Sequence, residues 1–584
     1  MTACLRNLTI IAGCLLGAVL VCVGVFESQV NSAQEPAGEK VLKSESPLVV
    51  LDVVVTDKKG QPVSGLKSSD FTVFEKDEQM TLQSFEEYRV DQAPPPAPPA
   101  EQALVPNVFT NIPDTRSDGP LNVLLMDALN TAMADQMYVR EQMLEYVKKV
   151  PQGTRIAIFG LSNRLYMLQN FTTDPAILKA DVQMFRAEKV SLPGGSDMGT
   201  IGPHGLFEKN LAFRGAYTRA AVEDLARYLS GLPGRKNLIW FAGSFPLRAM
   251  PDGDRENRFG AMANFADDEK WIANLLTRDR VVVYPIDARG LFTNPEMHAD
   301  VAVPEGAERL DGRTPGEFQQ SEVNFLGQRA DDKIAMNMLA ERTGGKAFYD
   351  TNGLKEAVQE AINDGSNYYT LAYAPANRKW DGRYRSIRVT VAESGVHLFY
   401  RQGYFAYDPN APRPHGAQTL PMSVMDSAML LGEPNPTQIP FMVKVVPTAG
   451  TANTLPPTNQ PNVKKMKPPY RRYTVWYDID LRNVAFTGTP GGIHRGSLEF
   501  EILLYNSNGH LMNAIKEIAK AKLPAAGYES RAWSGLKFHQ NIDAPAKGEY
   551  FLRIGVHDVA SDRVGAVEVP LAAIQPESVS NTDR

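Results

Sequence analysis

The sequence predicts a multidomain protein in which a central three-layer α/β (Rossmann-like) domain is flanked by β-rich segments and followed by a C-terminal β-sandwich. Apolar strands alternate with segments of helical periodicity between residues 119 and 375, which is typical of an α/β domain. Short alternating strands separated by turn residues fill residues 47–90 and 441–573 instead. The 584 residues are enough for roughly three or four such domains.

The composition is that of an ordinary globular protein, since 43% of the residues are hydrophobic and 22% are charged. The net charge of −6 gives no reason to expect a nucleic-acid partner. The three cysteines, Cys4, Cys14 and Cys22, all lie in the first 22 residues. If that segment is removed, the remaining chain has no thiol for a disulfide, a thiolate metal site or a cysteine nucleophile.

Residues 1–33 have the pattern of an export signal peptide. A basic residue precedes an apolar stretch from Ile10 to Phe26, and small residues around Ala33 form a candidate cleavage site. Lipidation of Cys14 and retention of the segment as a membrane anchor are the two alternatives. In each case we expect the chain beyond a linker at 34–46 to be exported and to be periplasmic, on the cell surface or secreted, with membrane contact only through this N-terminal segment.

The flanking regions are predicted to be β structure joined by linkers. Residues 47–90 contain too few strands to bury a core alone, so we expect strands within 380–407 to pair with them. The remaining predicted parts are a Pro-rich linker at 91–118, a second linker at 408–440, the β-sandwich at 441–573 and a tail at 574–584.

Within 119–375, strand and helix alternate, which predicts a mostly parallel sheet with helices on both faces. The expected strands are 121–126, 155–161, 237–241, 281–286, 347–349 and 368–373. Gly- and Pro-rich stretches at 189–210 and 246–266 are predicted to be surface insertions at one end of this sheet.

In an open parallel sheet, ligands bind at the carboxyl ends of the strands. Polar residues follow three of the predicted strands or open a predicted helix, and we expect them to form one crest at that edge. The crest residues are Asp127, Asn130, Thr131, Thr218, Ser244 and Asp287.

An apolar strand that ends in Asp127, with Thr131 four residues later, resembles the von Willebrand factor type A domain. Thr218, at the start of a predicted helix, resembles the metal-site threonine of that family. The β segments on either side resemble those of a subgroup of exported bacterial proteins with a related domain. The resemblance implies a non-enzymatic, adhesion-type protein that binds a protein or extracellular matrix partner through the crest.

Members of this family bind a divalent cation through an Asp-x-Ser-x-Ser loop, a threonine and a second aspartate. Here Leu129 stands at the first serine position, and Ala242-Gly243-Ser244 replaces the usual Thr-Asp-Gly. The resemblance therefore leaves Asp127, Thr131 and Thr218 as metal ligands, with Asn130 or Ser244 as an alternative further oxygen donor. Because only one carboxylate remains, we expect Mg²⁺ or Mn²⁺ to bind weakly or not at all. The alternative is that these side chains only hydrogen-bond backbone groups at the strand ends.

Two other functions remain open. The first is a structural or assembly component of the cell envelope whose contacts lie on the β-sandwich. The second is a serine hydrolase that uses Ser244, although the G-x-S-x-G pattern is absent and no histidine is tied to this serine by spacing.

Overall fold

The structure is a computed structural model that describes residues 48–89, 106–112, 120–151, 153–185, 203–245, 270–290, 315–407, 422–462, 464–488, 493–524 and 535–575. The predicted signal segment and linker at 1–46 lie outside these ranges, as does most of the insertions at 189–210 and 246–266. Among the described residues, no helix has the length and apolarity to cross a membrane.

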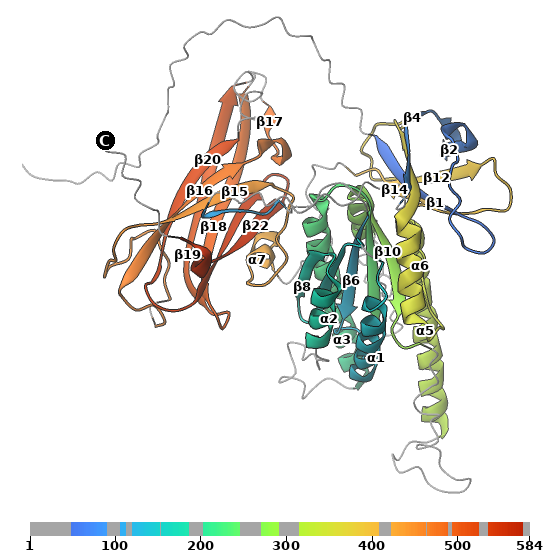
Figure 1. The fold of residues 1–584 in the computed structure, drawn as a ribbon, viewed down its shortest axis with the longest axis horizontal. Helices are drawn as coiled ribbons and strands as arrows, with labels where there is room; N and C mark the ends of the chain where they lie inside the picture. The colour runs from blue at the N-terminus through green and yellow to red at the C-terminus, as the bar shows by residue number, and fades with distance from the viewer. Residues whose placement is uncertain are drawn as a thin grey trace, which may run out of the picture. The chain divides into compact units, whose positions relative to one another are not determined.

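The central sheet has five strands in the order β10-β9-β6-β7-β8 (Figure 1). Its strands are β6 (Leu121–Asp127), β7 (Ile156–Leu161), β8 (Leu165–Thr172), β9 (Lys236–Ala242) and β10 (Val281–Asp287). All neighbours are parallel except β8, which runs antiparallel to β7 at one edge. Every residue of β6, β9 and β10 is buried, as in a sheet that is covered on both faces.

Successive strand residues point to opposite faces of the sheet. Because the central strands are apolar on both faces, helices cover both of them. Leu124 and Met126 share a hydrophobic core with one set of helices, and Val123 and Leu125 share a second core with another set. The first set is α1 (Met133–Val147), α2 (Pro175–Met184) and α6 (Leu354–Ser366). The second set is α3 (Pro203–Ser230), the helical residues 270–278 and α5 (Pro315–Thr343).

The prediction that 368–373 is the last strand of the central sheet is wrong. β11 (Asn367–Tyr373) instead lies between β1 (Val49–Thr56) and β4 (Leu82–Arg89), antiparallel to both. Its side chains Tyr369 and Leu371 pack in the core of the flanking β region. An apolar strand can be buried equally well in either sheet, so periodicity did not distinguish the two.

The flanking β region joins the two chain segments for which the sequence predicts a pairing. β2 (Phe71–Glu75) pairs with β12 (Tyr384–Val391), and β1 pairs with β13 (His397–Phe399). Two four-stranded sheets result, in the orders β13-β1-β11-β4 and β14-β12-β2-β3. The remaining elements are β3 (Glu78–Met80), β14 (Gly403–Phe405) and a short 3-10 helix at Ser68–Asp70.

The C-terminal region consists of two further sheets, whose inward residues form one hydrophobic core. The first sheet is β20 (Leu536–Pro545), β16 (Tyr470–Ile479), β15 (Phe441–Pro447) and β5 (Val108–Thr110). The second is β17 (Thr487–Gly488), β18 (Ile493–Asn506), β19 (Leu511–Pro524), β21 (Tyr550–Asp558) and β22 (Arg563–Pro570). Short 3-10 helices occur at Leu481–Asn483 and Leu571–Ala573.

Two segments predicted as linkers contain ordered elements. β5 lies within the predicted linker 91–118 and pairs with β15, where Phe109 packs against the C-terminal core. α7 (Val424–Ala428) lies within the predicted linker 408–440 and packs on β22 residues such as Val564. Both elements are short, and their stability comes from tertiary packing that local sequence does not reveal.

Candidate functional site

The carboxyl ends of three parallel strands meet at one edge of the central sheet. The register places Asp287 opposite Ala242 and Met126 opposite Phe241, so β6, β9 and β10 end side by side. The chain segments that follow these strands therefore converge, although they are far apart in the sequence.

Asp127 is the central acceptor of this edge. One carboxylate oxygen accepts the backbone N–H of Asn130 at 2.9 Å, and the other accepts Asn130 Nδ2 at 2.8 Å and Trp240 Nε1 at 3.1 Å. All three partners are N–H donors, which suits an ionised carboxylate because it can only accept. Burial raises the pKa of Asp127 to about 6, while the donors from Asn130 and Trp240 oppose that rise. The side chain is thus mainly ionised at neutral pH.

Asn130 connects Asp127 to α3. Its Nδ2 also donates to Thr218 Oγ1 at 2.8 Å, so one amide nitrogen lies between two of the predicted metal ligands. Thr218 is fully buried. It does not open a helix as predicted, because α3 begins at Pro203 and passes through it. No proline follows Pro203 before Thr218, and the helix continues through Gly215, which is tolerated in a helix interior at a cost of about 1 kcal/mol.

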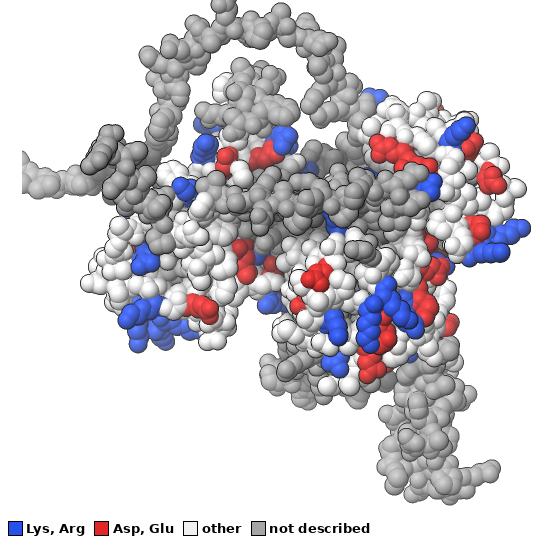
Figure 2. All heavy atoms as spheres, viewed as in Figure 1, with Lys and Arg blue, Asp and Glu red and all other residues white. Residues whose placement is uncertain are grey.

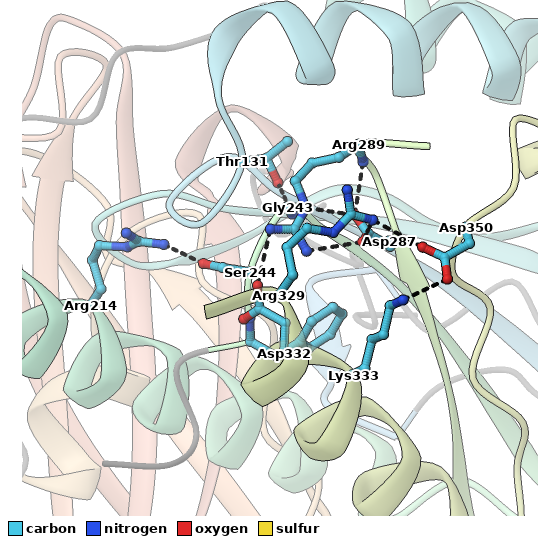
Figure 3. Close-up of polar contacts among 11 residues, drawn as sticks. Thr131, Arg214, Gly243, Ser244, Asp287, Arg289, Arg329, Asp332, Lys333 and Asp350 are labelled. Carbon is cyan, nitrogen blue, oxygen red and sulfur yellow. Dashed lines mark hydrogen bonds and ion pairs between the residues drawn. The ribbon is translucent and has the colours of Figure 1, made fainter. Parts of the chain in front are cut away.

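Arg214 is a site residue that the sequence analysis missed. Its Nε donates to Asn130 Oδ1 at 3.0 Å. Its Nη2 donates to Ser244 Oγ at 2.5 Å (Figure 3). Arg214 and Thr218 are four residues apart on α3 and therefore share one helix face. That i, i+4 spacing was a usable signal, but it required knowing that the helix extends this far.

Thr131 is held against the end of β9. Its hydroxyl accepts the backbone N–H of Gly243 at 3.0 Å. A Cβ added at Gly243 would lie 3.1 Å from the backbone oxygen of Asn130, so this close approach favours glycine.

Asp287 belongs to a second, neighbouring network. Arg289 Nε and Nη2 donate to its two carboxylate oxygens, each at 2.9 Å. Arg289 Nη1 also lies 3.0 Å from an oxygen of Asp332, whose other oxygen accepts the backbone N–H of Phe245 at 3.0 Å. Burial raises the pKa of Asp332, and the charge of Arg289 opposes that rise. This network ties the end of β9 to α5.

The exposed margin of the crest is formed by residues from α5 and the loop before α6. Arg329 Nη2 and Lys333 Nζ both contact the carboxylate of Asp350, at 3.0 Å and 2.5 Å (Figure 3). The side chains of Lys333 and Asp350 are 33% and 46% exposed. Every predicted crest residue, by contrast, is less than 9% exposed. A partner would therefore touch this margin before the polar network beneath it.

The predicted metal ligands do not have the donor set that a divalent cation requires. Asp127 is the single carboxylate among them, and hard cations such as Mg²⁺ and Ca²⁺ take several oxygen ligands. The oxygens of Asp127, Thr131 and Thr218 already accept hydrogen bonds from N–H groups. Within the described ranges, no group of three or more His, Cys, Asp or Glu side chains is placed to hold a metal.

Fold and site together give an α/β domain with a polar edge where its parallel strands end, and comparisons with solved structures found proteins to which the chain is similar. A vWF domain of a pilus tip protein from Porphyromonas gingivalis is 17% identical, over 21% of this chain and 38% of that chain, with a TM-score of 0.14. An aerotolerance-related membrane protein from Bacteroides fragilis is 10% identical, over 42% of this chain and 98% of that chain, with a TM-score of 0.23.

A third similar structure is proximal thread matrix protein 1 from the mussel byssus, described with a zinc-occupied MIDAS motif. It is 11% identical, over 44% of this chain and 47% of the mussel chain, with a TM-score of 0.23. The match therefore spans about half of the mussel protein. No protein-family model and no curated protein matches the chain. Identities and TM-scores this low carry no argument about function.

Proposed function

We propose that this protein is an exported, non-enzymatic, adhesion-type protein that engages a protein or extracellular matrix partner through the crest of its α/β domain. One observation carries the proposal. Residues from three separate chain segments form a single hydrogen-bonded network at the edge where the strands end: Asp127 and Asn130, Arg214 and Thr218, and Ser244. Such an edge is the usual ligand-binding position of an open α/β sheet.

The contacts of Ser244 support a binding role over hydrolysis. Its Oγ accepts a hydrogen bond from Arg214, which stays protonated and cannot act as a general base. Export is proposed from the N-terminal sequence pattern alone. Acidic and basic side chains are interspersed over the described surface in Figure 2, so the visible face offers no extended basic region for a nucleic acid.

A role in envelope assembly through the C-terminal sheets is the second candidate, and one observation favours it. Trp476 on β16 is 49% exposed and stacks on His539 of β20, with ring centroids 4.7 Å apart. Exposed aromatic side chains are common anchors of protein interfaces.

Affinity capture from the envelope fraction with the full chain tests both candidates. Lys333→Ala with Asp350→Ala changes the exposed margin of the crest, and Trp476→Ala changes the C-terminal sheet. Lys148→Ala, an exposed residue just after the end of α1, is the matched control. If a captured protein is lost with Lys333→Ala/Asp350→Ala but not with Trp476→Ala, the result supports partner binding at the crest. Loss with Trp476→Ala alone supports envelope assembly instead and contradicts the main proposal.

A further inference from the structure

We propose that the Arg214 guanidinium is the resident cation of the crest, that it takes the role played by a divalent metal ion in the family that this domain resembles, and that it binds a carboxylate of the partner without a metal. The carboxylate part rests on the proposed function, whereas the identity of the cation does not.

The orientation of the ligand oxygens is the first observation. Asn130 Nδ2 lies within 2.8 Å of both Asp127 and Thr218, and the Thr131 hydroxyl is occupied by the backbone N–H of Gly243. A metal ion and an N–H group compete for the same oxygen lone pairs. The three predicted ligands are therefore arranged around nitrogen donors.

The charge balance is the second observation. In the family pattern two aspartates face a divalent ion. Here the second aspartate is missing from Ala242-Gly243-Ser244, and Asp127 is connected through Asn130 to the monovalent guanidinium of Arg214. The loss of one negative charge thus matches the change from a divalent to a monovalent cation. Ser244, in the altered segment, accepts a hydrogen bond from that same guanidinium.

The hydrogen bonds of Arg214 leave one donor group for a ligand. Nε and Nη2 are used by Asn130 and Ser244, whereas no residue in the described part of the chain accepts from Nη1. Arg289, in the neighbouring network, directs Nε and Nη2 to Asp287 and Nη1 to Asp332. A guanidinium nitrogen with unused N–H groups is suited to an incoming carboxylate. The partner group that fits Arg214 is therefore an aspartate or glutamate side chain.

The cation is tested by titrating the full chain with Mn²⁺ in a calorimeter. We expect no binding by the wild type up to about 1 mM and at least tenfold tighter binding by Asn130→Asp combined with Arg214→Ala, which supplies a second carboxylate and removes the guanidinium. Asn130→Asp alone is the matched control and should not bind, because Arg214 remains. Circular dichroism verifies that each variant is folded.

Two results of this titration would overturn the inference. One is wild-type Mn²⁺ binding that Asp127→Asn abolishes. The other is a folded double variant that binds no tighter than the wild type. If the double variant does not fold, the wild type compared with Asp127→Asn decides the question alone. No partner is present in these titrations, so they test the identity of the cation alone. The affinity capture tests partner binding alone, and each proposal can therefore be refuted without the other.

The carboxylate is tested with acetate as the probe. Sodium acetate should raise the Tm of the wild-type chain above its value in sodium chloride of equal ionic strength, because a ligand of the native state stabilises it. Arg214→Gln should abolish that difference, and Arg278→Gln, at an exposed arginine paired with Asp279, should keep it. An equal Tm in both salts, or an acetate effect that remains in Arg214→Gln, would show that Arg214 only stabilises the crest through its bonds to Asn130 and Ser244 and does not bind a carboxylate.

Discussion

Replacing Asn130 with alanine should destabilise the α/β domain, because this buried side chain holds three partners together. It donates to Asp127 and Thr218, each at 2.8 Å, and accepts from Arg214 at 3.0 Å. Two of these bonds involve a charged partner, worth about 1.5–3 kcal/mol each, and the third is worth about 1 kcal/mol. Water entering the space left by the side chain will recover part of the sum. We therefore expect a loss of about 3 kcal/mol in the free energy of unfolding.

Hydrogen exchange measured by mass spectrometry is the appropriate assay, because it reports on peptides of the crest separately from the other domains. Protection should fall in peptides that cover 121–131 and 236–244. Asn163→Ala is the matched control, since Asn163 is exposed and accepts one bond, from Ser162 at 3.2 Å. It should change stability by less than about 0.5 kcal/mol. A loss below about 1 kcal/mol for Asn130→Ala would refute the view that this amide organises the crest.

Three further predictions concern backbone packing and pH. Gly243→Ala should lower the free energy of unfolding, measured by thermal unfolding, by about 1–2 kcal/mol, because its Cβ would lie 3.1 Å from a backbone oxygen. Gly327→Ala is the control on α5, where the added Cβ meets no atom within 4 Å, and it should stabilise by about 0.5–1 kcal/mol. Equal effects of the two variants would contradict the close approach at Gly243. Partial burial lowers the pKa of His557, but its hydrogen bonds to the carboxylates of Glu499 and Asp562 outweigh burial and raise the pKa above its ordinary value. The ion pairs of the protonated His557 therefore stabilise the fold fully below pH 6.5, and this stabilisation is lost as the pH rises through the raised pKa. Urea titrations of His557→Gln should then show a larger deficit at about pH 6 than at about pH 9, and a constant deficit would contradict the shift. Burial raises the pKa of Glu433 to about 8, so the stability of the wild type should fall as the pH rises from the ordinary pKa of a glutamate toward 8. In urea titrations, Glu433→Gln should remove this pH-dependent fall in stability. A variant with the same pH profile as the wild type would contradict the raised pKa.

Local patterns were sufficient for the central strands and for the edge at which they end. A fully buried parallel strand is a continuous apolar run, so 121–126, 237–241 and 281–286 were recognisable, and each is followed by polar residues. The same reasoning failed for 368–373, because a strand carries no local mark of the sheet that it will join. Thr218, which Asn130 connects to Asp127, was predicted at a helix start but lies within α3.

Arg214 shows most clearly what local patterns do not contain. An arginine on a helix is usually a solvated surface residue, and nothing in its neighbourhood in the sequence indicates Asn130 or Ser244 as partners. Those contacts arise because α3 packs against the sheet with one face toward the strand ends. The resemblance predicts oxygen donors around a metal ion, whereas the cation bonded to Asn130 and Ser244 is Arg214 of the chain itself.

The sequence by itself determined which segments are apolar strands, where they end, and that Asp127 is the single carboxylate among the predicted metal ligands, since these are properties of neighbouring residues. The tertiary structure alone decided that β11 joins the flanking sheet and that Asn130 separates Asp127 from Thr218. It also decided that Arg214 faces the crest. The physical reason is that hydrogen bonds and charge compensation between distant residues depend on the packing of whole elements, which local periodicity does not encode.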